Sequence, residues 1–261
     1  ALVEAQTEAP KRIIQYVTTP VYNRLNWLRA KDENSNLNSH NIKFQISNPI
    51  LASLKEAMPI STDSKDQKAK KSDDWSFWSE GNVSIGKIGD TTTSLPKNIN
   101  TNGITVGIDI QLNKDILHGY AFTYTKDDVD ISSSGTSLDI DSYSISKYAT
   151  FHQDENKFVE GTVGISKLDL KHIRESNSNI LHGDRDGQQI YGSINYIASI
   201  RSNNFTIAPS VKVNISHTIL EDYSETGTNA LDYKKQYIQT GALYTGIMFD
   251  SVIEKKDISF R

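Results

Sequence analysis

The feature that most constrains this chain is a regular alternation of apolar residues with small or polar ones, which runs from Ile104 to Phe249. In the clearest copy, residues 104–112, aliphatic side chains occupy every second position and Thr105 and Asp109 lie between them. A β-strand points successive side chains to opposite faces, so this segment is a strand with one apolar and one polar face. Soluble sandwiches and membrane barrels both show this alternation, so the choice between them depends on the rest of the chain.

Composition narrows the class of protein. The chain has 261 residues, 36% of them hydrophobic, and no cysteine. No run reaches the ~18 apolar residues of a membrane-spanning helix, whereas a transmembrane strand needs only about 9–11 residues of alternating character. The lack of cysteine removes thiolate zinc sites and cysteine nucleophiles. A net charge of −4 with scattered Lys and Arg gives no basis for nucleic-acid binding.

The alternating region predicts a series of antiparallel strands joined by polar turns. Their predicted ranges are 75–89, 102–113, 117–130, 138–152, 156–172, 187–202, 205–221 and 235–252. Short connections alternate with longer polar ones, for which we expect the ranges 89–101, 131–137, 173–186 and 222–234. Short turns at one end and long loops at the other are typical of an outer-membrane barrel.

The first sixty residues follow a different pattern. Apolar residues at spacings of three and four predict a helix over 8–30, with a kink or new start at Pro20. Residues 42–46 alternate like a short strand, and 49–58 read as a second helix. The following Lys-, Asp- and Ser-rich tract is a polar linker. We therefore divide the chain into a helical linker or plug (1–60), a charged linker (61–74) and a barrel (75–261).

Several residues, taken in this order, resemble the translocator domain of type V autotransporters. Upstream, Tyr22-Asn-Arg-Leu25 and Leu28-Arg29 are similar to the family's helix before the barrel. The further matching positions are Trp75, Gly81, Gly103, Gly107, Asp109, Gly119, Ala121, Tyr124, Tyr143, Tyr148, Gly161, Gly164, Arg174, Pro209, Glu221, Glu225 and Gly227.

The resemblance implies an up-and-down transmembrane β-barrel of 12 strands with an N-terminal helix passing through its lumen. The chain departs from the family at Lys256–Arg261, which reads as the opening of a ninth strand. We therefore expect either that three or four C-terminal strands of the family pattern are missing or that the barrel is smaller than the family's. Since Ala1 does not open a signal peptide, we also expect a mature or cut piece.

The same resemblance implies a mechanical function in the outer membrane of a Gram-negative bacterium. The barrel would anchor in outer-membrane lipid, with the barrel-assembly machinery as a further partner, while an N-terminal passenger reaches the cell surface. A helix of 8–30 has the length to span the lumen, where Arg12, Arg24 and Arg29 could pair with inward carboxylates such as Asp109 or Glu160. We predict no catalytic residues, no metal and no cofactor, and no nucleic-acid partner.

The two faces of the strands make further predictions about side chains. The polar face would line a wet interior, and aromatic residues would form girdles at the membrane interfaces. The predicted inward residues are Thr105, Asp109, Gln111, Thr123, Glu160, Asn195 and Lys212. The predicted girdle residues are Trp75, Trp78, Tyr124, Tyr143, Tyr148, Tyr191, Tyr196, Tyr237 and Tyr244.

Two alternatives stay open. An outer-membrane barrel enzyme, such as a surface protease, would need His118, His172 or His182 to converge with Asp on the long-loop side. A soluble β-rich adhesin or binding module would pack its aliphatic faces in a dry interior. The stretch 182–187 resembles part of a calcium loop but lacks the later ligands, and we interpret it as a polar turn.

Overall fold

The computed structural model describes residues 2–29, 39–46, 75–89, 95–132, 135–154, 156–176, 179–201, 205–251, 253–255 and 258–260. One helix, α1 (Leu2–Arg29), precedes the strands. The long strands are β2 (Ser76–Ile88), β3 (Lys97–Gln111), β4 (Ile116–Ile131), β5 (Thr136–Asp154), β6 (Lys157–Ser176), β7 (Asn179–Ala198), β9 (Phe205–Leu220) and β12 (Gln236–Ser251). The short ones are β1 (Ser39–Ile46), β8 (Ile200–Arg201), β10 (Tyr223–Ser224), β11 (Asp232–Tyr233), β13 (Ile253–Lys255) and β14 (Ile258–Phe260).

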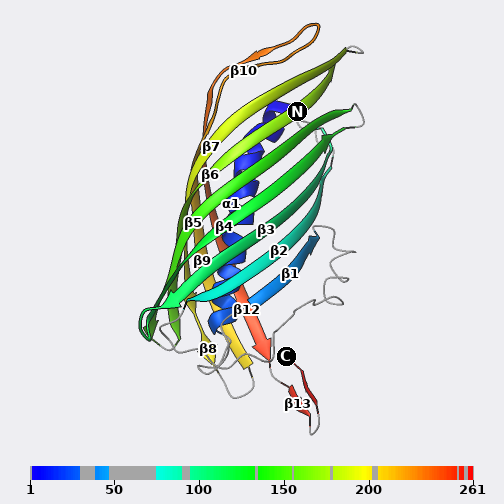
Figure 1. Ribbon diagram of the computed structural model, residues 1–261. Helices are drawn as coiled ribbons and strands as arrows, with labels where there is room; N and C mark the ends of the chain where they lie inside the picture. Colours follow the sequence, from blue (N-terminus) through cyan, green and yellow to red (C-terminus); the bar gives the residue numbers. More distant parts are fainter. Residues whose placement is uncertain are drawn as a thin grey trace.

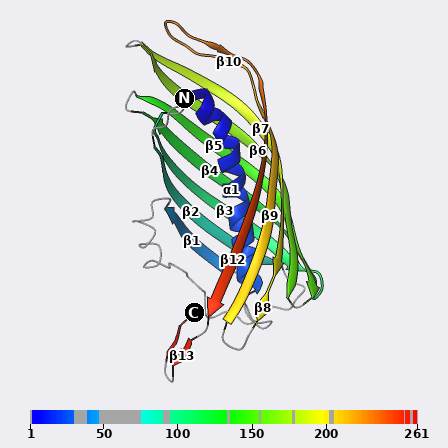
Figure 2. The ribbon, with the colours of Figure 1, turned by 180° about the vertical axis from the view of Figure 1, so that it is seen from behind.

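The long strands form one up-and-down sheet in the order β1-β2-β3-β4-β5-β6-β7-β9-β12. Every neighbouring pair along this path is antiparallel except β1 and β2, which run parallel. The sheet curves around α1, which runs from the upper rim near Leu2 to the lower rim near Arg29 (Figures 1 and 2). Within the described residues the two edge strands, β1 and β12, are not paired with each other, so the sheet is not closed.

The helix is continuous from Leu2 to Arg29, so the expected new start at Pro20 is wrong. Pro10 and Pro20 both lie inside α1. A proline costs a backbone hydrogen bond, but burial of one whole helix face outweighs that cost: Val17, Val21 and Leu25 are at most 1% exposed. The expected helix at 49–58 and the polar linker 61–74 lie outside the described residues. No helix in the described part of the chain is long and apolar enough to cross a membrane.

The strands are longer than the sequence predicts at the upper rim. Residues 173–186, expected as a loop, instead belong mostly to the β6–β7 hairpin, whose pairing continues to Ser176 and Asn179. The loop expected at 131–137 is likewise shortened, since β4 and β5 pair up to Ile131 and Thr136. Near the C-terminus β14 pairs with β13 rather than adding a ninth strand beside β12.

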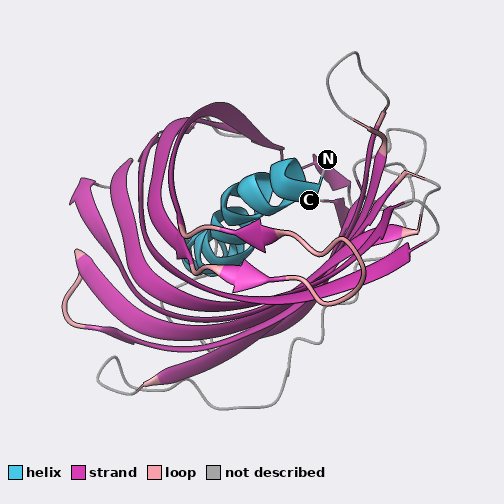
Figure 3. Cartoon of the chain, turned by 90° about the horizontal axis from the view of Figure 1, so that it is seen from above, coloured by secondary structure: helices cyan, strands magenta, loops and turns pink. Residues whose placement is uncertain are grey.

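Two buried clusters join the helix to the inner face of the sheet. Towards the upper rim, Ile13 and Ile14 of α1 belong to a cluster with inward residues of the strands, including Leu138, Leu168 and Leu220. A second cluster contains Val21, Tyr22 and Leu25 of α1 with Trp78, Leu117, Ala121 and Tyr148. Figure 3 shows the helix on the concave side of the sheet. The described interior is therefore filled by α1.

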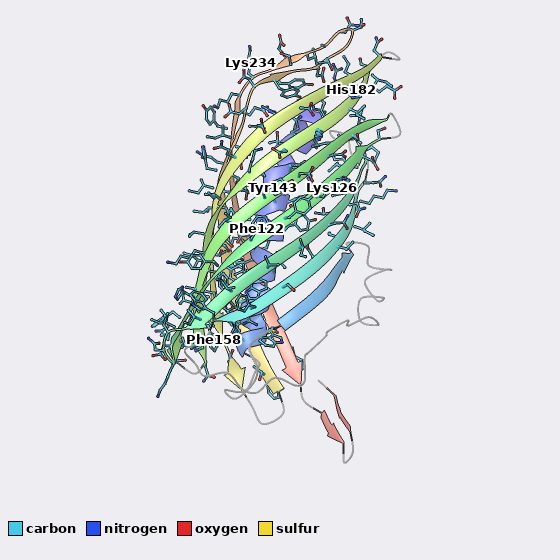
Figure 4. All side chains as sticks on the ribbon, viewed as in Figure 1. Phe122, Lys126, Tyr143, Phe158, His182 and Lys234 are labelled. Carbon is cyan, nitrogen blue, oxygen red and sulfur yellow. The ribbon has the colours of Figure 1, made fainter. Side chains whose placement is uncertain are left out.

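The outer face carries an apolar band. Outward residues at 104–110, 116–124, 143–151, 159–165, 190–198, 205–219 and 243–249 are almost all apolar, aromatic or small. The segments 143–151 and 190–198 each contain nine residues, within the length of about 9–11 that a tilted transmembrane strand requires. Above the band the outward residues become charged, as at Lys126 beside Tyr143 in Figure 4. This is the arrangement of a membrane-facing surface with a hydrated rim.

Candidate functional site: the polar lumen around helix α1

Strand parity places three carboxylates inside the sheet. Tyr120 and Phe122 of β4 face outward, so the odd–even alternation turns Asp127 inward. Asp109 of β3 and Glu160 of β6 occupy the corresponding inward positions, and all three residues are at most 1% exposed. A buried carboxylate is costly unless a cation and hydrogen-bond donors reach it. Each of the three receives an arginine from α1.

Arg24 and Asp109 form the deepest pair. The guanidinium Nε and Nη2 donate to Asp109 Oδ2 and Oδ1, both at 2.8 Å, and each side chain is 1% exposed. Tyr148 Oη donates to Asp109 Oδ2 at 2.8 Å and in turn accepts from Trp78 Nε1 at 2.7 Å. The two-point geometry fixes both the position and the rotation of the helix.

Arg12 and Arg29 make the same kind of contact nearer the two rims. Arg12 Nη2 lies 2.6 Å from Asp127 Oδ2. The other carboxylate oxygen, Asp127 Oδ1, accepts a hydrogen bond from Thr101 Oγ1 at 2.5 Å. Arg29 Nη1 pairs with Glu160 Oε1, while Asn195 Nδ2 donates to Glu160 Oε2 at 3.1 Å.

Further polar contacts tie the helix to the wall where the sequence reasoning named none. Lys97, at the start of β3, is 1% exposed, and its Nζ lies 3.0 Å from both Glu4 Oε1 and Glu8 Oε2. On the other side of the lumen, Gln189 Nε2 donates to the Pro10 carbonyl at 3.0 Å. Other helix contacts are Asn23 with Glu80, Tyr22 with Ser193 and Gln15 with Tyr244. Inward parity alone would have identified Asp127, but not Lys97, because residues 89–101 were expected to form a loop and β3 instead begins at Lys97.

A second polar cluster, the rim cluster, joins the β9–β12 loop to the upper rim. Glu225 accepts from Arg174 Nε at 2.8 Å and Nη2 at 2.6 Å, and from the Leu231 backbone N–H at 3.1 Å. His172 Nε2 lies 3.3 Å from Glu225 Oε1. Tyr223, from the same loop, accepts a hydrogen bond from Gln6 of the helix at 3.3 Å. The loop is thereby fastened both to the wall and to the helix start.

The charges of the rim cluster are set by their neighbours. The hydrogen bonds from Arg174 lower the pKa of Glu225 to about 2, against the cost of its burial. Burial lowers the pKa of His172, more than the hydrogen bond with Glu225 raises it, so the neutral imidazole is favoured. The cluster is therefore an Arg–carboxylate pair with a neutral histidine beside it.

A family model described as the autotransporter β-domain matches residues 77–261. The chain belongs to this family. Among solved structures, the translocator domain of the autotransporter NalP from Neisseria meningitidis is similar in fold, with a TM-score of 0.55 at 10% identity. The match covers 58% of this chain and 54% of that one, so the chain spans about half the length of the solved domain. No curated protein matches the sequence.

Family membership makes this autotransporter domain an outer-membrane translocator domain. The predicted family, its fold of antiparallel strands with an N-terminal helix, and its translocator function are thereby confirmed.

Four of the expected girdle aromatics of this autotransporter domain are in fact interior residues. Trp78, Tyr148 and Tyr191 are at most 3% exposed and face the lumen, and Tyr244 hydrogen-bonds to Gln15 of the helix. The prediction failed because Trp and Tyr have polar groups that suit a wet interior as well as an interface. The outward aromatics include Tyr120, Phe122, Tyr143, Tyr196 and Tyr237.

The residues that an enzyme would need stay apart in the described structure. His118 packs edge-on against Trp75 near the lower rim, while His172 belongs to the rim cluster and His182 is exposed on β7. The stretch 182–187 is strand rather than the expected polar turn, and it turns Arg185 inward between outward Asp184 and Asp186. Among the described residues, no group of three His, Asp or Glu side chains could hold a metal ion.

Proposed function

We propose that α1 is the segment through which the passenger is linked to the barrel, and that it stays seated in the lumen by its arginine contacts. In this scheme residues 1–60 form the linker or plug, 61–74 a polar connection and 75–261 the barrel. The domain acts mechanically, and no bond is made or broken in it. It resides in the outer membrane of a Gram-negative bacterium and reaches it through the barrel-assembly machinery.

The observation that carries this proposal is the set of buried pairs along one helix. From Arg12 to Arg29 the helix rises about 26 Å at ~1.5 Å per residue. That rise matches the roughly 25 Å height of the apolar band of outer-membrane barrels. The three pairs therefore hold the helix at both membrane interfaces and at the level between them. A helix merely packed on a soluble domain has no need of contacts at this spacing.

Buried ion pairs specify position more than they add stability. Removing two charges from water costs several kcal/mol each, and their attraction roughly offsets that cost when every oxygen has a donor. Losing one partner leaves an unpaired buried charge and is expensive. The pairs at Arg24 and Asp109 thus penalise any other rotation or depth of α1, which suits a segment that must come to rest at one place.

The polar residues of the lumen support a domain that acts mechanically and not as an enzyme. Asp109, Asp127 and Glu160 each carry a cationic partner and a second donor, so their lone pairs are engaged in holding the helix. The separation of His118 from His172 along the strands argues against a protease-like rim. We favour the translocator over the enzyme on these contacts.

The orientation of the helix tests the proposal. Since the chain has no native cysteine, single cysteines report on one site each. Val3 lies at the exposed start of α1, and Lys114 lies in the exposed lower turn between β3 and β4. The variants Val3→Cys and Lys114→Cys therefore report on the two ends of the domain. With cells intact, a membrane-impermeant maleimide should label Val3→Cys, and Lys114→Cys should react only after the outer membrane is opened. The reverse pattern, or labelling of both in a soluble fraction without detergent, would contradict the proposal.

A further inference from the structure

Lys147 is a charged residue within the apolar band. It is outward and exposed at the middle of the β5 segment 143–151. Across the band segments that the structure describes, it is the one Asp, Glu, Lys or Arg side chain that faces outward. A lysine at the level of the bilayer midplane costs about 2–4 kcal/mol on a barrel surface. An ionisable residue at membrane depth is by default a candidate functional site, and a lysine there requires an anionic partner.

The neighbours of Lys147 on the surface supply no such anion. Its cross-strand partners are Tyr120 on β4 and Val163 on β6, and the Nζ lies 5.8 Å from the centre of the Tyr120 ring. Along the strand it stands between Ile145 and Ala149, both outward. The ring attracts the ammonium but carries no net charge, so Lys147 still lacks a counter-ion and can pair with an anionic ligand from the membrane.

A hollow of about 420 Å³ lies in the outer surface beside Lys147. The larger residues that line it are Val163, Ile194, Val213 and Ile215. The small outward residues Ala149, Gly161 and Gly192 lie between them and leave the space open. The register places Lys147 and Gly192 on either side of Val163, and Gly161 between Ala149 and Ile194. Charge and hollow thus belong to one surface site.

The two glycines are not required by packing within the protein. A Cβ at Gly161 or Gly192 would meet no atom closer than 3.8 Å, which is ordinary van der Waals contact. At other glycines of the sheet an added Cβ would clash: a Cβ at Gly107 would lie 2.3 Å from the Trp78 ring and one at Gly164 2.3 Å from Tyr191 Oη, whereas Gly241 of β12 is open like Gly161 and Gly192. Glycine inside a strand often marks the close approach of a ligand.

We propose that Lys147 and this hollow bind a glycerophospholipid, with an acyl chain in the hollow and the phosphate paired with the Lys147 ammonium. This rests on the proposed membrane placement of the domain. Charge complementarity selects a phosphate-bearing lipid, and the apolar walls continue the lipid-facing band. Lys147, Ala149, Gly161 and Gly192 are the residues that define the site.

The position of the hollow selects the leaflet. Along β5 and β6 it extends from Lys147 towards the lower rim, at Ala149 and Gly161. From Lys147 to Phe151 the strand advances about 13 Å, or roughly 9 Å along the membrane normal at a tilt near 45°. The lysine stem can snorkel across most of that distance. The lower rim faces the periplasm in the proposed orientation, and that leaflet is made of glycerophospholipids.

Competitive lipid retention tests the site. The wild-type chain is reconstituted in vesicles of equal parts phosphatidylglycerol and a galactosyl diacylglycerol that lacks phosphate, then extracted for native mass spectrometry. We expect wild type to retain one phosphatidylglycerol in preference. Lys147→Gln should lower that preference about tenfold, the size of one charge-assisted contact. Gly192→Leu, which fills the hollow, should reduce retention of both lipids. Lys87→Gln and Gly241→Leu, outside the hollow, are the matched controls.

The outcomes separate this site from the proposed function. Flotation with the vesicles reports insertion, so a chain that fails to float contradicts the membrane placement itself. A chain that floats but retains both lipids equally, or whose preference survives Lys147→Gln, overturns the lipid site alone. The site is equally overturned if added lipid A displaces phosphatidylglycerol, or if the retained mass is a second copy of the chain held through Lys147.

Discussion

At the scale of single residues, the lumen is specified by carboxylates that have more than one donor. Asp109 is the clearest case, since Arg24 approaches with two nitrogens and Tyr148 with its hydroxyl. A buried charge satisfied in this way contributes little net free energy while complete and a large penalty when broken. The same logic distinguishes the Arg24 pair from that of Arg12, whose side chain is 15% exposed and thus partly hydrated.

We predict that Arg24→Met destabilises the domain by about 3–5 kcal/mol, because Asp109 stays buried without its cation. The double variant Arg24→Met with Asp109→Leu should recover most of that loss. Urea unfolding in micelles, followed by tryptophan fluorescence, measures both. Lys114→Gln in an exposed turn should change the free energy of unfolding by no more than ~0.5 kcal/mol. A double variant no better than the single one would show that the pair itself stabilises the fold.

The rim cluster predicts a pH dependence of the β9–β12 loop. Because the folded pKa of Glu225 is lowered from 4.5 to about 2, its contribution is complete above pH 4.5 and is lost as the pH falls towards 2. His172 acts in the same direction, since its pKa is lowered and protonation below its ordinary 6.5 is resisted by the fold. The protection of residues 221–235 against hydrogen exchange, taken relative to the intrinsic exchange rate at each pH, should therefore fall on acidification.

The matched variant for this loop is Glu225→Gln, which removes the charge that Arg174 binds. At pH 7 the protection factors of its loop should be as low as those of the wild-type loop at low pH, and they should depend less on pH. Asp232→Asn, at an exposed hydrogen bond with Ser224, is the control and should keep the wild-type profile. Unchanged protection factors of the wild-type loop between pH 7 and pH 3 would contradict the assignment of Glu225 as the loop's fastening point.

At the scale of elements, strand parity was predictable and strand length was not. In 104–112 the alternation coincides with the burial of Thr105 and Asp109. It failed at 173–186, where the hairpin rises above the apolar band and both faces meet polar surroundings, so outward Asp184 and inward Arg185 give no apolar contrast. The contact between Arg174 and Glu225 joins residues 51 apart in the chain, and no local pattern encodes it.

A one-residue insertion tests whether the register of α1 against the sheet is fixed by its ion pairs. One alanine inserted after Asn26 turns the last residues by about 100° and moves them ~1.5 Å along the axis. Arg29 then leaves Glu160, which is 0% exposed and becomes an unpaired buried carboxylate, while the Arg24 pair stays intact. We expect a loss of about 3–5 kcal/mol in urea unfolding.

A substitution of the same element that keeps the register is the comparison for this insertion. Thr19→Ala, on a half-buried position of α1, should cost less than ~1 kcal/mol. If the insertion is tolerated as well as Thr19→Ala, the lower turn of α1 is not positioned by Glu160. Recovery of the insertion variant by Glu160→Gln would, in contrast, support the pairing.

At the scale of the whole molecule, the two faces of the sheet address different solvents. Inside, polar side chains meet a helix that brings its own charges. Outside, an apolar band of transmembrane length is bounded above by charged residues such as Lys126 and, at both of its margins on β5, by Tyr143 and Phe151. If the outer face of this sheet met water instead of lipid, the same aliphatic residues would be hydrated, and an added charge would be costly at none of them.

Depth therefore decides between the membrane and the soluble readings. Val106 is 46% exposed in the middle of the β3 band segment, and Ile180 is 62% exposed on β7 near the upper rim, above the band. In lipid vesicles Val106→Arg should cost about 2–4 kcal/mol and Ile180→Arg only ~0–1 kcal/mol, since the penalty for arginine falls towards the interface. If the outer face met water, both side chains would already be hydrated, and the two substitutions would have small and equal effects on the free energy of unfolding. The test is to measure the free energies of unfolding of the two variants in the same vesicles. The difference between the two values, and neither value alone, distinguishes a membrane-embedded sheet from one surrounded by water.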